Sequence, residues 1–312
     1  MQARSQFGTV ISLLVSGIIC SKLGWPYVFY IFGVLGCLWF ILWMNLVFNS
    51  PAEHPRISIS EKVYIEKQIG GSSQRRKLPW KAILTSVPVW ACAVAHTTYN
   101  WGFYTLLTSL PTYMNDILHF DISSNGIISA LPYVVMWIVI VLNGQFADCL
   151  RTRHILSTTA VRKIFNTIGM VCPALILVGL GYVKCDAKLA VGLLIAAGGM
   201  AGFSQSGYNV NHLDLAPPYA GTLIGLTNTA ATIPGFLAPQ VVGALTNDNH
   251  TSTQWRKVFF ISAAMYVIGA FFFLIFSSGK EQPWARGNQL GDQEEEHDEN
   301  SVNKSRNGQV RP

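Results

Sequence analysis

The chain has 312 residues, of which half are apolar and only 12% are charged, and its mean hydropathy is +0.34. An ordinary soluble domain has about a quarter of its residues charged, so the composition excludes that class and indicates a membrane protein. The net charge of +6 does not require a nucleic-acid partner, because the loops of a membrane topology account for the basic residues.

Eight apolar stretches are long enough to cross a bilayer as helices. They are predicted at residues 6–23, 26–48, 88–110, 124–146, 163–183, 189–210, 219–244 and 257–277. Lys, Arg, Asp and Glu fall in or beside the connections, as expected when a charge at a helix centre costs about 2.5–3.5 kcal/mol. The predicted fold class is therefore an all-α membrane protein.

The number of cations alternates between connections and so predicts the orientation. Residues 49–86 carry seven Lys and Arg, residues 110–125 none, residues 147–163 four, and the tail after Ser278 five. By the positive-inside rule, both chain ends are expected in the cytosol. Asn249-His250-Thr251 is an N-glycosylation sequon in a connection on the opposite side, so Asn249 is expected to carry a glycan.

The order of the spans suggests four regions. Residues 1–48 hold the first two spans, and residues 49–86 form a long polar connection that is expected to be a cytoplasmic linker between two bundles. Residues 87–278 hold six further spans. Residues 279–312 contain few apolar residues and a run of glutamates, so a disordered cytoplasmic tail is expected there.

The third span carries polar side chains along one helical face, at Thr97, Asn100, Tyr104 and Thr108. In hydrocarbon such a stripe must face a partner helix or a water-filled cavity. Hydrogen bonding between helices is one interpretation. A cavity wall is the interpretation favoured by the neighbouring aromatic residues, among them Tyr99.

The fourth span ends in the pattern Gly144-x-x-Ala147-Asp148-x-x-Arg151-x-Arg153. Gly144 and Ala147 allow two helices to approach closely, and Asp148 can pair with Arg151 or Arg153. Such a latch can be made and broken during a conformational change. An ordinary basic loop that obeys the positive-inside rule is the alternative.

The sixth span has small residues at four-residue intervals, Gly198, Gly202 and Ser206, which predict close helix packing. A set of hydrogen-bonding side chains overlaps and follows it: Gln205, Asn209 and His212. Small residues give access and amides give hydrogen bonds, so Ser206 and Asn209 are candidate binding residues.

Two further features follow the amides of the sixth span. At the exit of that span, His212 and Asp214 favour capping and loop anchoring over proton relay. The seventh span contains Pro234 and Pro239, which predict a broken or bent helix that lines a cavity or acts as a hinge.

Several stretches carry a family resemblance: GTVISLLVSGIIC, YNWGFYTLLTSLPTYM, GQFAD, NVNHLDLAP and YAGTLIGLTNTAATIPGFLAP. They resemble the branch of the major facilitator superfamily that holds the sialic acid and vesicular glutamate transporters. The resemblance implies twelve helices in two six-helix halves, with the substrate between the halves. On that plan the eight spans match the fifth to the twelfth helix, and the first four helices are absent. The arginine that holds the substrate carboxylate and the proton-coupling groups are implied to lie largely in those four.

The resemblance implies a secondary active transporter that moves a small organic anion with a proton, with sialic acid as the favoured substrate. The vesicular glutamate transporters carry an arginine where this chain has Tyr99. Tyr104, Asn100, Ser206, Asn209 and Tyr99 are expected to bind the substrate as neutral hydrogen-bonding side chains. The residues expected to act in conformational change are Gly144, Asp148, Arg151, Arg153 and Pro234.

The expected partners are the lipid bilayer, the organic anion and the proton. No enzymatic activity, cofactor, metal or nucleic-acid partner is expected. The expected location is a lysosomal or a synaptic or secretory vesicle membrane, with the plasma membrane as a further alternative. Glutamate, aspartate or sodium-phosphate transport remains an alternative function, and so does a truncated isoform that does not transport.

Overall fold

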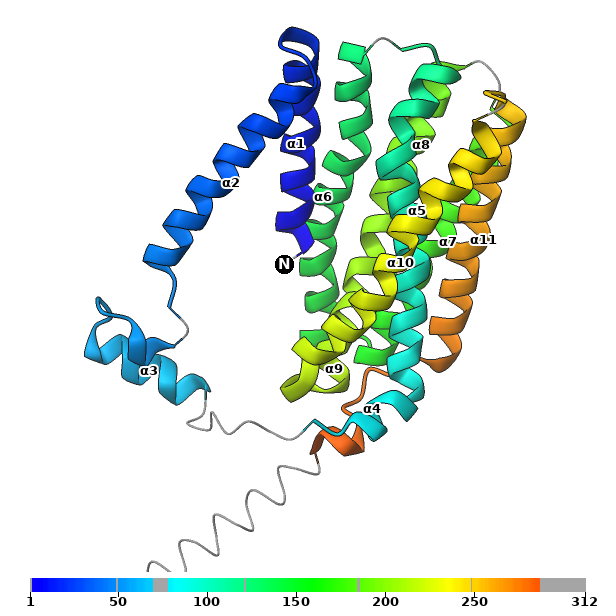
Figure 1. The fold of residues 1–312 in the computed structure, drawn as a ribbon. Coiled ribbons are helices and arrows are strands. Elements are labelled where there is room, and N and C mark those ends of the chain that lie inside the picture. The colour runs from blue at the N-terminus through cyan, green and yellow to red at the C-terminus, as the bar shows by residue number, and fades with distance from the viewer. Residues whose placement is uncertain are drawn as a thin grey trace, which may run out of the picture. The chain divides into compact units, whose positions relative to one another are not determined.

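The computed structural model describes residues 2–48, 50–69, 78–120, 122–183, 186–247 and 249–286, and their regular structure is helical (Figure 1). The α-helices are α1 (Gln2–Lys22), α2 (Pro26–Leu46), α3 (Ile59–Ile69), α4 (Trp80–Thr85), α5 (Val87–Asp116), α6 (Ile122–Thr152), α7 (Thr158–Leu180), α8 (Ala187–Ala201), α9 (Tyr208–Leu215), α10 (Ala220–Thr246) and α11 (Ser252–Phe276). Three short 3-10 helices are η1 (Pro51–Glu53), η2 (Gly202–Ser206) and η3 (Pro217–Tyr219). The predicted all-α class is confirmed.

The chain divides into two units, Ile18–Leu78 and the remainder, Met1–Gly17 with Pro79–Pro312. In the smaller unit the chain reverses between α1 and α2 at Gly24, whose φ of +96° suits glycine. Pro26 then begins α2, where its fixed φ is suited to a first helical position. None of the residues of α2 is buried within the described structure.

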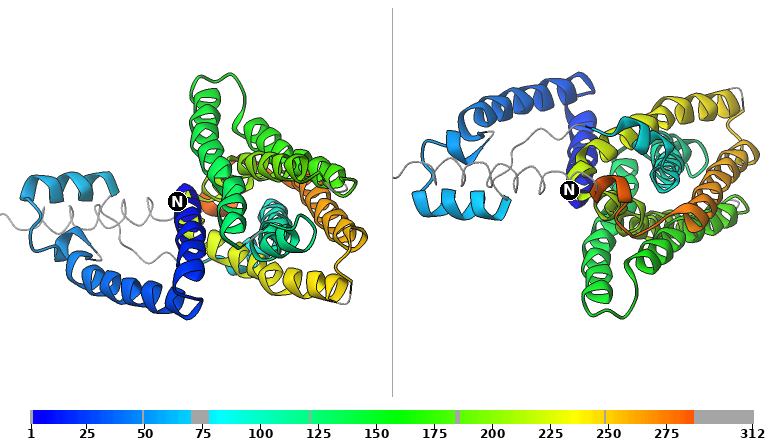
Figure 2. Two further views of the ribbon diagram at one scale, coloured as in Figure 1. Left: turned by 90° about the horizontal axis from the view of Figure 1, so that it is seen from above. Right: turned by 90° about the horizontal axis from the view of Figure 1, so that it is seen from below.

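The larger unit is a helical bundle in which α5 packs along both α10 and α11 and also contacts α6 and α9 (Figure 2). The neighbours of α7 are α8 and α11, and α6 packs against α8. Glycines permit the closest approaches. At Gly102 of α5, the ring of Tyr266 from α11 occupies the space that a side chain would need.

Each predicted span coincides with helical structure. Among the described residues, five segments are long and apolar enough to cross a membrane: Pro26–Leu46, Ile127–Thr152, Thr158–Leu180, Ala187–Leu215 and Ser252–Phe276. Phe7–Lys22 of α1 is apolar but shorter. With 30 and 27 residues, α5 and α10 are long enough to cross a membrane, but their sequences are less hydrophobic than those of the five segments. These are the helices of the third and seventh predicted spans, which carry polar side chains.

The seventh span was predicted to be broken or bent; it is not broken, and the break in helical structure lies in the sixth span instead. With Pro234 and Pro239 inside it, α10 remains one helix from Ala220 to Thr246. Membrane helices tolerate proline where neighbours supply hydrogen bonds to the backbone. Here the side-chain nitrogen of Asn100 donates to the carbonyl oxygen of Ala231, 2.8 Å away and about one turn before Pro234.

In the sixth span, α8 ends at Ala201, and the chain continues as η2 and then α9. Close approach to α7 explains the break. The backbone of Ser204 occupies the space where a side chain on Gly169 would lie, and a Cβ atom on Gly207 would lie 2.8 Å from the backbone of Asn166. The predicted small-residue stripe does pack closely, because a Cβ on Gly198 would lie 2.9 Å from Pro132 of α6.

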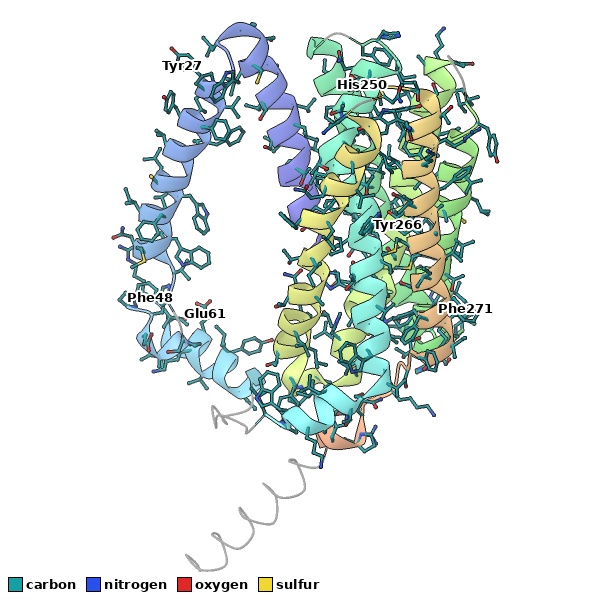
Figure 3. All side chains as sticks on the ribbon, turned by 45° about the vertical axis from the view of Figure 1, so that its right-hand side comes forward. Tyr27, Phe48, Glu61, His250, Tyr266 and Phe271 are labelled. Carbon is teal, nitrogen blue, oxygen red and sulfur yellow. The ribbon has the colours of Figure 1, made fainter. Side chains whose placement is uncertain are left out.

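The last helix, α11, is less lipid-facing than its sequence indicates. One face buries Trp255, Phe259, Tyr266 and Phe273 within the bundle. The opposite face exposes Phe271, which lies at the outer edge in Figure 3. Both faces are apolar and aromatic, so periodicity alone does not separate the face that contacts protein from the face that contacts lipid.

Two polar connections fix the ends of the bundle. Between the end of α5 and the α10–α11 connection, Nδ1 of His250 lies 2.7 Å from the carboxylate of Asp116 (Figure 3). At the other end, the backbone N–H of Gln282 donates to the carbonyl oxygen of Leu215 at 2.8 Å, and Ala285 is buried. Residues 279–286 are therefore ordered against the bundle, and the remainder of the predicted tail lies outside the described residues.

Candidate functional site

Three of the predicted substrate residues, Tyr99, Asn100 and Tyr104, lie on α5, but not on one face. Tyr99 is only 2% exposed, whereas Asn100 and Tyr104 are half-buried. Asn100 bridges to α10 through its bond to Ala231. The ring of Tyr104 lies against α10 at Gly235, where a Cβ atom would be 3.2 Å from the ring. Both contacts flank Pro234.

The other two predicted substrate residues, Ser206 and Asn209, lie at the break of the sixth span. The side-chain nitrogen of Asn143 donates to the hydroxyl of Ser206 and to the carbonyl oxygen of Phe203, both at 3.2 Å. The side-chain nitrogen of Asn209 donates to the amide oxygen of Gln205 at 2.8 Å. Side chains thus form hydrogen bonds in a segment where the regular backbone hydrogen bonding of an α-helix is interrupted.

Aromatic contacts connect these two groups. The rings of Tyr99 and Tyr208 lie 5.5 Å apart, and those of Tyr99 and Tyr266 lie 6.4 Å apart. The hydroxyl of Tyr99 also lies near the side chain of Gln205. Buried Tyr99 therefore acts as packing between α5 and the broken helix, while Tyr104, Asn100 and Asn209 keep partly exposed side chains.

Two histidines meet one threonine between α5, α9 and α10. Nδ1 of His96 lies 3.3 Å from the hydroxyl of Thr227, and Nε2 of His212 lies 2.9 Å from the same oxygen. Nδ1 of His212 lies 2.9 Å from the carbonyl oxygen of Asn209. The prediction that His212 caps a helix or anchors a loop was wrong, because its side chain is fully buried and links two helices.

An ion-pair network joins α6, α7 and α9. The guanidinium of Arg151 lies 3.6 Å from Asp148 and 3.6 Å from Asp214. Arg162 forms a closer pair with Asp214, at 2.6 Å, and is only 2% exposed. The predicted pairing of Asp148 with Arg151 is present, and the anchoring role expected for Asp214 is consistent with both contacts.

The remaining residues of the α6 pattern behave differently. Ala147 is buried in a small apolar cluster with Val161 and Phe165, as its predicted packing role requires. Gly144 has no neighbouring atom within 4 Å of a Cβ position, so the expected close approach at Gly144 is absent from the described structure. Arg153 forms no ion pair within the described residues.

Sequence reasoning missed two residues that organise this region, Arg162 and Thr227. Arg162 was counted among the loop cations, although its position near the start of a span was a signal for an internal role. Thr227 lies in an apolar helix and gives no signal by itself. His96 lies three residues before Tyr99, in the third span. The polar character of that span was an indirect indication that His96 has a functional role.

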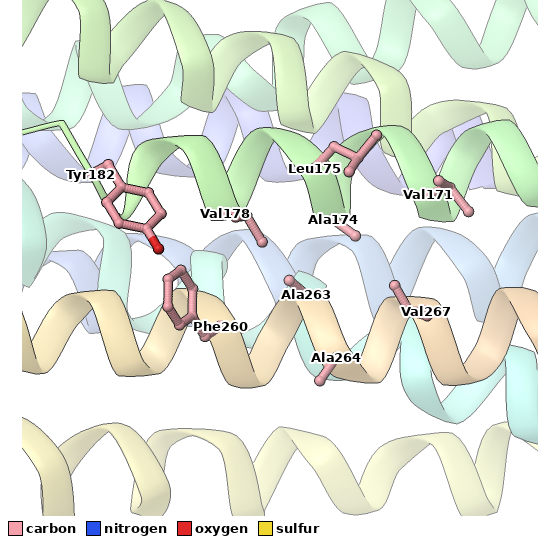
Figure 4. A pocket seen from close by; sticks show the side chains of 9 residues that line it. All are labelled: Val171, Ala174, Leu175, Val178, Tyr182, Phe260, Ala263, Ala264 and Val267. Carbon is pink, nitrogen blue, oxygen red and sulfur yellow. The ribbon is translucent and has the colours of Figure 1, made fainter.

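A separate apolar groove of about 400 Å³ lies between α7 and α11 (Figure 4). It is lined by Val171, Ala174, Leu175, Val178, Tyr182, Phe260, Ala263, Ala264 and Val267. Leu175 and Tyr182 are mostly exposed there. This groove does not include the predicted substrate residues, and its lining suits an acyl chain better than a polar anion.

The comparisons with known proteins identify the family of the chain. Residues 1–239 match the family profile described as Major Facilitator Superfamily. Sialin of Homo sapiens is 50% identical over 290 residues, which cover 93% of this chain and 58% of sialin. Vesicular glutamate transporter 3 of Danio rerio is 45% identical over 289 residues, which cover 90% of this chain and 48% of that protein. The chain thus spans about half the length of these relatives.

Among solved structures, a bacterial homologue of the human lysosomal transporter Spinster, in an inward-facing and unoccupied conformation, has a TM-score of 0.56. Its sequence identity is 16%, and the match covers 91% of this chain and 67% of that chain. The likeness shows the fold. The family profile, which covers residues 1–239, shows that the chain belongs to the major facilitator superfamily.

Proposed function

We propose that the protein takes part in proton-coupled transport of a small organic anion across a lysosomal or vesicular membrane, with sialic acid as the substrate. The observation that carries the proposal is the set of neutral, partly exposed side chains Tyr104, Asn100 and Asn209 on a family member's six-helix bundle. Hydroxyl and amide groups of this kind orient a polyhydroxylated acid through hydrogen bonds.

Neutral side chains alone do not bind a carboxylate strongly, so a cation must complete the site. Within the larger unit, Arg162 is committed to Asp214 and to the carbonyl oxygen of Ser206. Arg151 is engaged with Asp148 and Asp214. We therefore assign the carboxylate-binding cation to the other half of the family's twelve-helix plan. The bundle described here contributes the hydrogen-bonding wall, which includes Ser206 and Tyr99 at its buried edge.

We propose that the α6 pattern forms a latch that opens and closes. Arg151 and Asp148 are 40% and 64% exposed, and their separation of 3.6 Å marks a weak pair that costs little to break. The Arg162–Asp214 pair is buried and stays closed in this proposal. Gly144 and Arg153, which have no such partners within the described bundle, are assigned to contacts made in another conformation, and Pro234 to bending of α10.

Uptake into proteoliposomes tests the function. The protein extended by the four upstream helices of the family plan is reconstituted beside the 312-residue chain, and uptake of labelled sialic acid is measured with and without an imposed pH gradient. We expect gradient-stimulated uptake by the extended chain and none by the shorter one, because alternating access needs both halves. Uptake that ignores the gradient would refute proton coupling, and equal rates from both chains would refute the half-site argument.

Two alternatives are tested by the same preparation. The 45% identity to a vesicular glutamate transporter favours glutamate or a related anion, so competition by glutamate, aspartate and phosphate is measured beside sialic acid. The second alternative is a truncated isoform that does not transport. That alternative predicts that the 312-residue chain inserts with both termini cytosolic and takes up no anion, even where the extended chain does.

A further inference from the structure

We propose that His96, Thr227 and His212 form a proton-binding site inside the six-helix bundle, in which an added proton is held between the two imidazoles through the threonine hydroxyl. The inference rests on the proposed function in one respect, since the proton bound here is the one that accompanies the organic anion. It places a coupling group in this half of the fold, whereas the family resemblance implies that these groups lie largely in the first four helices.

Geometry fixes the hydrogen-bond directions in the neutral state. The carbonyl oxygen of Asn209 can only accept, so Nδ1 of His212, 2.9 Å away, carries a hydrogen. Nε2 of neutral His212 is then an acceptor, and the hydroxyl of Thr227 donates to it at 2.9 Å. The lone pairs of Thr227 remain free to accept from Nδ1 of His96 at 3.3 Å.

The same groups can take up one proton without losing hydrogen bonds. If His212 is protonated on Nε2, both its nitrogens donate, and Thr227 accepts instead of donating. The hydroxyl hydrogen of Thr227 then points to Nδ1 of His96, which accepts it at 3.3 Å. The pairs His96–Thr227, Thr227–His212 and His212–Asn209 stay hydrogen-bonded, and both N–H groups of His212 keep an acceptor, which is the main requirement for a buried polar network.

The proton enters through His96. Its Nε2 makes no hydrogen bond within the described residues and receives the proton. As Nδ1 of His96 passes its hydrogen to Thr227, the hydroxyl hydrogen moves to Nε2 of His212. His96 ends neutral with its hydrogen on Nε2, and His212 ends as the cation, so protons and charge balance.

Few ionisable groups surround this site. Cys92 and Tyr99 lie on α5 and Tyr208 on α9, with the ring of Tyr208 5.1 Å from that of His96. On α11, the ring of Tyr266 lies 6.4 Å from that of Tyr99, and on α7, Arg162 pairs with Asp214. Asp214, on α9, is the carboxylate nearest in sequence to His212, and α10 carries no ionisable residue.

Asp214 is already paired with Arg162, so the charge on His212 lacks a dedicated counter-ion. A buried cation of this kind is costly unless an anion approaches. Asn100 lies four residues after His96, about 6 Å along the helix axis, and Asn209 holds His212 through its carbonyl. An organic anion bound by these side chains would stabilise the added proton, and the proton would strengthen anion binding by the same factor.

Substitution of the bridging hydroxyl tests the site in the extended protein. Thr227→Val removes the hydroxyl with little change of shape, and Thr227→Ser keeps it. Thr246→Val is the matched control, because Thr246 is also buried in α10 but donates only to Val242 of its own helix. The measurement is the ratio of sialic acid uptake with a pH gradient to uptake at equal pH on both sides.

We expect Thr227→Val to lose the stimulation by the gradient, whereas Thr227→Ser and Thr246→Val keep the wild-type ratio. A wild-type ratio in Thr227→Val would overturn the proposal. If the wild-type protein takes up no organic anion, the proposed function fails, but the proton site is still testable by a measurement that needs no transport.

That measurement is the nitrogen spectrum of 15N-histidine-labelled protein, with signals assigned by His96→Gln and His212→Gln. Near pH 8 we expect His212 to carry hydrogen on Nδ1 and none on Nε2. As the pH is lowered from about 8, Nε2 should gain one hydrogen, and sialic acid should raise the pH at which it does so. A hydrogen-free Nδ1 on His212, or an Nε2 that gains no hydrogen with or without sialic acid, would refute the site even if Thr227→Val does not fold.

Discussion

Arg162 and Asp214 form a two-point contact in which Nε lies 2.6 Å from one carboxylate oxygen and Nη2 lies 3.3 Å from the other. Nη1 of the same guanidinium donates to the carbonyl oxygen of Ser206 at 2.9 Å. One cation thereby joins α7, α9 and the η2 segment. Three separate acceptors match the planar fork of arginine, a geometry that lysine does not provide.

Replacing Arg162 by Met should destabilise the bundle strongly. The change keeps a long side chain but leaves Asp214 with only Arg151 as a counter-ion, and the Ser206 carbonyl loses its donor. Loss of one partner of a buried pair costs on the order of 3–5 kcal/mol. Thermal unfolding of the purified protein in detergent measures the effect.

The control is Arg286→Gln, which removes the more exposed Arg286–Glu281 pair, whose atoms lie 3.2 Å apart. Such a pair contributes about 0–1 kcal/mol. Similar shifts of the unfolding temperature in both variants would show that Arg162 does not hold the broken helix.

Gly169→Ala should destabilise the contact between α7 and η2. The added methyl group would occupy the position of the Ser204 backbone, which cannot move as a flexible side chain does. Gly179→Ala is the matched control on the same helix, because no atom lies within 4 Å of its Cβ position. We expect the control to be neutral or stabilised by up to about 1 kcal/mol through helix propensity. Equal loss of folded protein in both variants would contradict the close approach.

The sequence predicted the helices well because charge segregation and apolar length are local properties. Ser157 illustrates this local control, since its hydroxyl accepts from the N–H of Ala160 and caps the start of α7. The break in the sixth span was less predictable. Its cause is the close approach of α7, where Gly169 of α7 meets η2 and Gly207 meets α7. The prolines of α10 pointed to the wrong helix.

The candidate site was only partly predictable for a similar reason. Polar periodicity on α5 identified Asn100 and Tyr104, which the structure leaves half-buried. The partners of Arg162 and Thr227 lie 52 and 131 residues away in the chain, at Asp214 and His96. A single sequence records no such tertiary pairing, so Arg162 was assigned to a loop by the rule that cations flank spans.

Asn249→Gln should abolish a glycan on the connection between α10 and α11. Asn249, His250 and Thr251 are all exposed there, and an exposed sequon is modified only on the lumenal side. The measurement is the mobility of the protein on a gel before and after glycosidase treatment. Asn247→Gln is the control, because Asn247 lies nearby but outside the sequon. A glycosidase-sensitive shift that persists in Asn249→Gln would contradict the assigned site, and the absence of any shift in the wild type would count against the proposed orientation.

Tyr104→Phe should weaken substrate binding without loss of folding. The hydroxyl of Tyr104 makes no hydrogen bond within the described residues, whereas its ring packs 5.6 Å from that of Phe103 and against Gly235. Phenylalanine preserves those ring contacts and removes only the hydroxyl. One neutral hydrogen bond contributes about 0.5–1.5 kcal/mol, so the apparent KM for sialic acid should rise roughly 2- to 10-fold.

Tyr182→Phe serves as the control, because Tyr182 lies on the exposed face near Phe260 and Arg256, in the apolar groove. Uptake by the extended protein is measured over a range of sialic acid concentrations, with expression and unfolding temperature matched. A wild-type KM in Tyr104→Phe would remove this hydroxyl from the substrate site, and an equal rise in Tyr182→Phe would show that the effect is not local to the site.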